Sequence, residues 1–295
     1  MLCKNLNTKC LTIIKDNNVK LTCPQFKKNL SSHQGLGKII IEMVDAEHYN
    51  EIMDIATSQS VYFYLIDILL NKDYIPTTKT LENLYLFGKA SEVYVNKFLK
   101  FGIKKTINCL VNACKTCCTL YMKDLLDNRI PYNNVCVRNC ISSTCTVQLK
   151  NEALELLIFY GYIITLDDIL FAIDYRYEFN DIDRFDIKLT KEVLEKCYRK
   201  NFHPKKYKFE GVMPSMRILH DATLAHGNIT FIKKIIKQYN VTPDNISMEN
   251  ACNTLRNKPV VDYLLEIGGT ITTQCIYNCA QFTRQNETLL LIINN

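Results

Sequence analysis

The chain has 295 residues, of which 47% are hydrophobic and 22% are charged, and its formal net charge is +6. These proportions match globular proteins and exclude an intrinsically disordered chain. The modest positive charge does not by itself indicate a nucleic-acid-binding protein. The chain has only 9 glycines and 7 prolines, whereas an all-β fold needs many turns. The composition therefore favours helices.

The sequence predicts an intracellular protein with no membrane partner. The N-terminal stretch lacks the long apolar region of a secretory signal peptide. No segment approaches the roughly 18 uninterrupted apolar residues of a membrane helix. The longest apolar stretch, VYFYLIDILL at 61–70, is interrupted by Asp67. In such a compartment the 14 cysteines are expected to be reduced.

Residues 1–45 show no clear periodic pattern, and we expect an N-terminal arm or cap there. From residue 46 onward, short apolar stretches alternate with turn residues in a way that predicts pairs of short helices. Neither helix of such a pair is long enough to be stable alone. The predicted pairs span 50–75, 80–103, 106–130, 134–162, 166–202 (a longer pair), 216–241, 249–272 and 274–295.

The pairs share an internal pattern, which is clearest at 249–272. Its first helix carries one small residue, Ala251, and its second helix carries the aliphatic pair Leu264 and Leu265. Gly268 ends the second helix, because glycine readily adopts a positive φ. The corresponding small residues of other pairs are Ala56, Ala90, Ala113, Cys140, Ala222 and Cys279.

Most of these small residues recur at intervals of roughly 30, which is typical of a solenoid built from two-helix repeats. Each repeat is too small to bury its own apolar face, so it is stable only when stacked on its neighbours. The sequence therefore predicts an all-α solenoid of about eight stacked helix-turn-helix repeats over 46–295.

The repeats resemble degenerate ankyrin repeats. Segments such as NACNTLRNKPVVDYLLEIGGTIT and HDATLAHGNITFIKKIIKQYNVT follow that family's order of a first helix with a small residue, a turn, an aliphatic second helix and a glycine. The Thr-Pro-Leu-His opening of the family is missing throughout, and several repeats are shorter than its roughly 33 residues. The Cys- and Asn-rich style also resembles the divergent ankyrin proteins of large DNA viruses, especially amoebal giant viruses.

Seven cysteines between 109 and 145 form the strongest candidate for chemistry. Cys114 and Cys117 have metal-ligand spacing, and zinc could join them to Cys136 or Cys140. The simpler interpretation is packing, because Cys140 occupies the position that holds alanine in other repeats. A buried thiol there acts as a small hydrophobic side chain. We therefore predict no metal site and no cofactor.

No enzyme activity is predicted either. The fragment Gly35-Leu36-Gly37-Lys38 lacks the preceding strand and the full glycine spacing of a phosphate-binding loop. His220 and His226 have no Cys-x-x-Cys nearby that would complete a metal site.

The segment at 199–214 interrupts the repeats and mixes basic and aromatic residues. Such a mixture can bind nucleic acid through phosphate contacts and base stacking. It can equally bind an acidic peptide, or be a solvated insertion without a binding role. The candidate binding residues are Arg199, Lys200, Phe202, Lys205, Lys206, Tyr207 and Lys208.

The resemblance implies a non-catalytic protein that binds other proteins through loop tips and a concave groove. It further implies a host or viral protein as the partner, in the cytoplasm of an infected host cell. Nucleic-acid binding through 199–214 is the alternative function. The sequence does not identify the partner or the oligomeric state.

Overall fold

The computed structural model describes residues 41–200, 202, 207, 209, 212, 215–225, 229–253 and 257–281, together with Ile13, Asp16 and Leu290. This part of the chain is helical and has no β-strand, which confirms the all-α prediction. None of the helices in it is long and apolar enough to cross a membrane. The chain divides into two compact units, Met1–Tyr162 and Ile163–Asn295. Most of the predicted arm at 1–45 lies outside the described residues.

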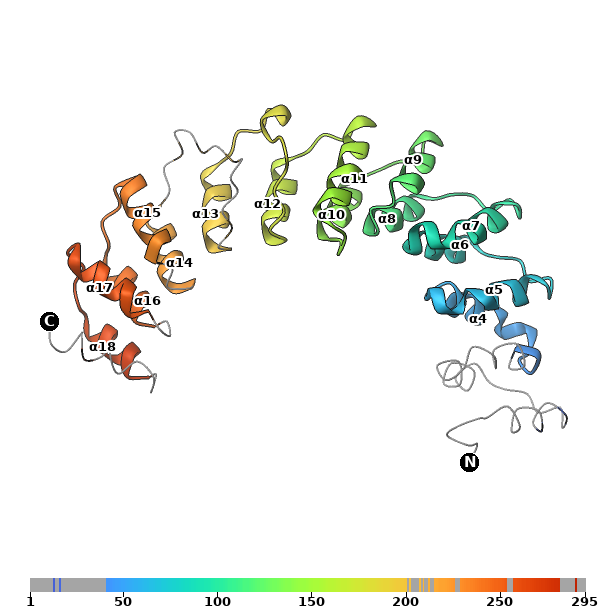
Figure 1. The fold of residues 1–295 in the computed structure, drawn as a ribbon, viewed down its shortest axis with the longest axis horizontal. Helices are drawn as coiled ribbons and strands as arrows, with labels where there is room; N and C mark the ends of the chain where they lie inside the picture. The colour runs from blue at the N-terminus through green and yellow to red at the C-terminus, as the bar shows by residue number, and fades with distance from the viewer. Residues whose placement is uncertain are drawn as a thin grey trace. The chain divides into compact units, whose positions relative to one another are not determined.

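Unit 1 is built from successive pairs of short helices (Figure 1). The first helices are α4 (Tyr49–Ala56), α6 (Thr78–Leu84), α8 (Ile107–Lys115) and α10 (Asn134–Ser142). The second helices are α5 (Phe63–Leu70), α7 (Glu92–Leu99), α9 (Thr119–Asp127) and α11 (Val147–Phe159). The 3₁₀ segments are η2 (Ala46–His48), η3 (Ser60–Tyr62) and η4 (Tyr85–Ser91).

The first helices of unit 1 pack on one another in chain order, α4 on α6, α6 on α8 and α8 on α10. The second helix α9 packs on both α8 and α11. Each pair therefore buries its apolar side against its neighbours as well as within itself. This arrangement explains how helices of only eight or nine residues, such as α4 and α8, are stable in this unit.

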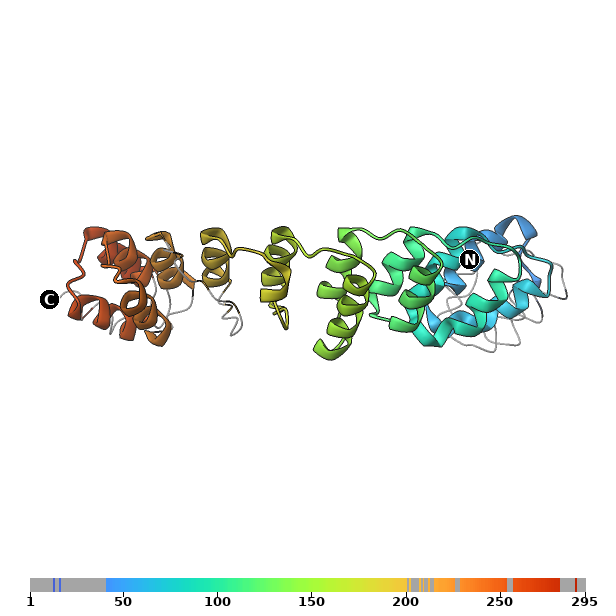
Figure 2. The same ribbon diagram turned by 90° about the horizontal axis from the view of Figure 1, so that it is seen from above.

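Unit 2 contains α12 to α18 (Figure 2). The helices α12, α13, α14, α16 and α18 pack on one another in that order, while α15 packs on α14 and α17. Their bounds are α12 (Leu166–Asp174), α13 (Lys191–Arg199), α14 (Arg217–Ala225), α15 (Ile229–Tyr239), α16 (Asn245–Cys252), α17 (Lys258–Glu266) and α18 (Thr273–Ala280), with η5 at Asp183–Phe185.

Most first helices begin at a polar cap whose side chain accepts a hydrogen bond from a backbone N–H of the first turn. These caps include Thr77, Asn133, Thr165, Thr190, Asp244 and Thr272. The seventh residue after the cap faces the neighbouring first helices and is buried, as at Ala251 after Asp244. The expected small residues Ala56, Ala113, Cys140, Ala222 and Cys279 are likewise buried.

Ala90 corrects one of the expected positions. It is exposed and lies in η4, not on the packing face of a first helix. The seventh residue after the cap Thr77 is Leu84, which is buried. Ala90 does not take the position of the small residue because η4 extends the first helix of this pair by an irregular turn.

The segment 166–202 is also organised differently from the single longer pair that was expected. Both α12 and α13 begin at a threonine cap, Thr165 and Thr190, and both bury the seventh residue after it, Ala172 and Cys197. Both are therefore first helices. Between them, over 175–190, the chain forms loops and η5 in place of a second helix.

Candidate functional site

The described part of the basic segment makes intramolecular contacts. Arg199 Nε lies 3.3 Å from Asp221 Oδ2, and Lys200 Nζ lies 3.2 Å from Asp174 Oδ1. These exposed ion pairs link α13 to α14 and to α12. Lys205, Lys206 and Lys208 lie outside the described residues.

The aromatic residues of the same segment pack inward. Tyr207 is only 6% exposed, and its ring lies 6.5 Å from that of Phe202 and 6.4 Å from that of Phe209. Burial raises the pKa of Tyr207 well above its usual value. Tyr207 therefore does not present a ring on which bases could stack, contrary to the expectation from the sequence. Its side chain belongs to the buried core instead.

A second aromatic group comes from the loop between α12 and α13. The ring of Phe179 lies 5.3 Å from Tyr177 and 5.9 Å from Phe185, both in edge-to-face geometry. The loop between α12 and α13 thus places aromatic rings where other pairs have a second helix.

The clustered cysteines meet between neighbouring first helices. Contact with the thiols of Cys136 and Cys140, together with burial, raises the pKa of Cys114 well above its usual value. All three side chains are buried, and the described cysteines are free thiols. In the part of the chain that is described, no three His, Cys, Asp or Glu side chains are arranged to hold a metal ion. The same contact recurs in unit 2 between Cys252, Cys275 and Cys279.

A series of asparagines, which the sequence analysis missed, joins consecutive first helices. Each stands immediately before the buried small residue and donates its side-chain N–H to a backbone carbonyl of the preceding first helix. The hydrogen bonds run from Asn112 to Glu82 (2.9 Å), Asn139 to Val111 (3.1 Å), Asn250 to His220 (3.1 Å) and Asn278 to Glu249 (2.9 Å). The signal in the sequence is the dipeptide Asn-Ala or Asn-Cys at 112–113, 139–140, 250–251 and 278–279.

The helix caps make a second contact along the same row. Thr106 Oγ1 donates to Glu82 Oε1 at 2.5 Å, and Thr272 Oγ1 donates to Glu249 Oε1 at 2.8 Å. At the equivalent place in another pair, His220 Nε2 lies 2.8 Å from Asp244 Oδ2. Each of these first helices is thus tied to the next through a cap and through an asparagine.

An apolar groove lies between the second helices α9 and α11 of unit 1, with a volume of about 720 Å³. We call it the α9–α11 groove. Phe159 is 82% exposed and Leu120 is 54% exposed, although both are large hydrophobic side chains. The groove is lined by Thr119, Leu120, Lys123, Gln148, Asn151, Glu152, Glu155, Leu156 and Phe159.

Charged side chains of opposite sign stand on the two walls of the α9–α11 groove. Lys123 belongs to α9, while Glu152 and Glu155 belong to α11. All three are exposed. Gln148 Nε2 donates to Glu152 Oε1 at 3.0 Å along the α11 wall.

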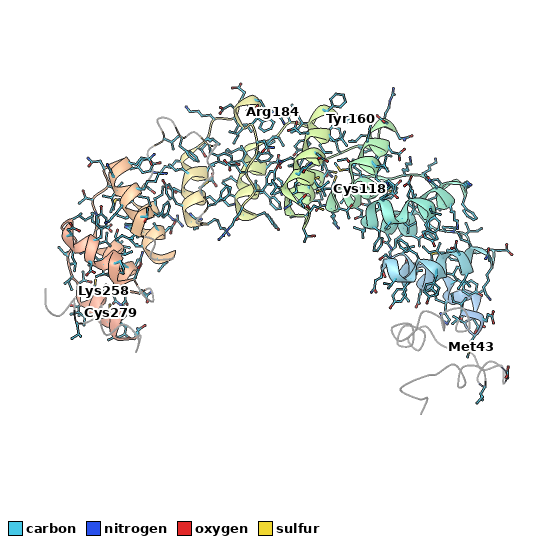
Figure 3. The ribbon with its side chains drawn as sticks, viewed as in Figure 1. Met43, Cys118, Tyr160, Arg184, Lys258 and Cys279 are labelled. Carbon is cyan, nitrogen blue, oxygen red and sulfur yellow. The ribbon has the colours of Figure 1, made fainter. Side chains whose placement is uncertain are left out.

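Tyr160 follows Phe159 at the end of α11 and is labelled in Figure 3, together with Cys118, the cap of α9. The Tyr160 hydroxyl donates to the Asp127 carboxylate at the end of α9. Its backbone carbonyl accepts from the Tyr132 hydroxyl at 2.8 Å, and its ring lies edge-to-face with Phe159 at 5.4 Å. Tyr160 therefore connects the two helices and contacts the Phe159 ring.

A smaller groove of about 290 Å³ is lined by Leu70, Lys97, Lys100 and Phe101. Lys97 forms an ion pair with Asp67 at 2.5 Å. This groove offers less apolar surface than the α9–α11 groove. The latter is therefore the stronger candidate for a binding site within the described residues.

The sequence did not reveal the α9–α11 groove. Leu156 and Leu157 take the place that Leu264 and Leu265 hold at 249–272, but only Leu157 is buried, while Leu156 lines the groove. No model of a known protein family matches the chain, and no curated protein matches it significantly.

Proposed function

We propose that this chain is a non-catalytic protein-recognition scaffold built as a solenoid of ankyrin-like helix-turn-helix repeats. Support comes from a register that α8 and α10 share in unit 1 and α16 and α18 share in unit 2. In each of these helices a cap is followed by an asparagine at the sixth position and a buried small residue at the seventh. Helices arranged in this way repeat a surface at regular intervals, which suits the binding of a macromolecule.

The observation that carries the proposal is the α9–α11 groove. Large hydrophobic side chains that are exposed together in a groove bordered by charge form a candidate interaction site. Phe159 is an exposed aromatic side chain whose ring contacts that of Tyr160, and aromatic residues are enriched at protein interfaces. The resemblance to viral ankyrin proteins makes a host or viral protein inside an infected cell the proposed partner class.

The test is affinity capture of the tagged chain from nuclease-treated host-cell lysate, with quantitative mass spectrometry. The variant Leu120→Asp/Phe159→Asp places charges in the groove and should lose the captured partner at least tenfold. Val93→Asp is the matched control, because Val93 is 62% exposed on α7 and lies away from this groove. Capture that is equal for wild type and the groove variant would contradict a binding role for the groove.

The same experiment addresses nucleic-acid binding through 199–214. Under that alternative, the captured material is nuclease-sensitive, its binding weakens steeply with salt, and Lys205→Glu/Lys206→Glu abolishes it. If a protein partner is still captured after nuclease treatment, and in the same amount by Lys205→Glu/Lys206→Glu, the result supports the scaffold.

A further inference from the structure

We infer that the α9–α11 groove binds an amphipathic helix of a partner protein, with basic side chains along one edge of the helix and acidic side chains along the other. This inference rests on the proposed function and specifies the kind of partner segment that the groove takes.

The groove favours a helix over an extended peptide because its walls offer no backbone hydrogen bonds to a bound segment. Both walls are α-helices, which satisfy their own backbone hydrogen bonds and offer no free sheet edge. An extended peptide laid on this apolar surface would leave its own N–H and C=O groups without partners. A helix pairs those groups internally and presents only side chains, as in other helix-in-groove interfaces.

The dimensions fit a helix of three to four turns. The wall α11 has 13 residues, which corresponds to a length of about 20 Å. The groove volume of about 720 Å³ is within the range of sites that hold several apolar side chains. Along α11 the lining residues 148, 152, 155 and 159 follow helical spacing. They form a continuous stripe against which a second helical stripe can pack.

The charges on the walls specify the edges of the bound helix. Glu152 and Glu155 on the α11 wall attract basic side chains, and Lys123 on the α9 wall attracts an acidic one. Such complementary charges determine which edge of the helix faces which wall, and so select partners more than they add affinity.

Tyr160 restricts the motion of a groove side chain before binding. Its contacts with Asp127 and Phe159 hold the aromatic anchor in place before a partner arrives. Less conformational freedom is then lost on association. Tyr160→Phe removes the hydroxyl contact with Asp127 but keeps the ring beneath Phe159, so it should weaken binding only a few-fold. Phe159→Ala removes the anchor and should weaken binding about tenfold or more.

The test is a phage-displayed library of random 16-residue peptides, selected on the full chain and sequenced. We expect the enriched peptides to carry apolar residues at helical spacing, with basic residues along one edge. Their synthetic versions should lose at least tenfold in affinity to Leu120→Asp/Phe159→Asp, and should bind Val93→Asp as tightly as the wild type. Circular dichroism of each variant confirms that its helices are intact. Glu152→Lys/Glu155→Lys should shift the selection from basic to acidic residues on that edge.

Two results would overturn the inference. One is the enrichment of extended or proline-rich peptides in the groove, and the other is a selection with no peptide that depends on the groove. If peptides are enriched but bind elsewhere on the chain, the inference fails while the proposed recognition function remains. If no peptide binds and lysate capture also finds no protein, both fail.

Discussion

The side chains of His220 and Asp244 form a polar contact in unit 2 between two consecutive first helices. Asp244 caps α16, accepting hydrogen bonds from the backbone and the hydroxyl of Ser247. Burial by itself raises the pKa of Asp244, but the hydrogen bonds from Ser247 and the contact with His220 outweigh it, so the pKa is lowered overall. The folded state therefore favours the charged carboxylate.

This contact predicts a pH-dependent effect of Asp244→Asn. Asparagine caps a helix as well as aspartate, so the substitution removes the charge and leaves the cap. Because the folded-state pKa of Asp244 lies below the unfolded value of about 3.9, its charge stabilises the wild type above about pH 4 and ceases to do so as the pH falls. At pH 6 the variant should be less stable by up to about 1 kcal/mol, since the carboxylate is partly exposed.

Urea unfolding at several pH values measures this difference. The stability difference between wild type and Asp244→Asn should shrink towards zero between about pH 4 and pH 2. A difference that is the same at pH 6 and pH 3 would show that the charge of Asp244 does not stabilise the fold.

At the scale of helices, the asparagine contacts fix how one first helix lies against the next. Asn250 on α16 donates to the His220 carbonyl of α14, and it is partly buried. Three further asparagines make the equivalent contact in their own repeats. Apolar packing alone would allow neighbouring helices to slide or rotate, whereas a directional hydrogen bond favours one arrangement.

Asn250→Ala should lower the free energy of unfolding by about 0.5–1.5 kcal/mol, the usual net value of one hydrogen bond. Asn253→Ala is the control, since Asn253 is exposed at the end of the same helix and should change stability by less than about 0.5 kcal/mol. Chemical denaturation followed by circular dichroism compares the two. Equal effects would mean that the contact with His220 contributes nothing specific.

The sequence was sufficient to predict helices, and most of their buried small residues, because burial between closely packed helices limits residue size. It was insufficient where the pairs depart from the pattern. Ala90 was misplaced because a 3₁₀ turn alters the spacing of its pair. Tyr207 was read as a binding residue because a basic segment does not reveal which way its aromatic rings point. The α9–α11 groove depends on exposure, which helical periodicity does not determine for Phe159.

At the scale of the whole molecule, each unit has its own set of packed helices. In unit 2 the buried core includes Leu194, Ile218, Met248 and Val260, contributed by successive helices. Stability in such an array is the sum of contacts between neighbours. A local defect is therefore expected to affect the nearest repeats most strongly.

Ala113→Leu should destabilise unit 1 by about 1–3 kcal/mol, because the larger side chain does not fit between first helices. Hydrogen exchange read by mass spectrometry should show the largest loss of protection in peptides of α8 and α10, with little change in unit 2. Ala251→Leu is the reciprocal control, and its largest loss of protection from hydrogen exchange should be in peptides of α16 and α18. Uniform loss of protection across both units would contradict this local response.

The shared register of caps and asparagines also bears on how repeats can be gained or lost during evolution. Excision of residues 106–132 would remove one helix pair and bring Asn139 to the place of Asn112, facing the Glu82 carbonyl. The asparagine contact of α10 could then be made with α6 in place of α8. Where neighbouring first helices share this register, duplication or deletion of a whole pair would keep the asparagine contact between the helices that remain. A lineage can lengthen or shorten its binding surface in single genetic steps.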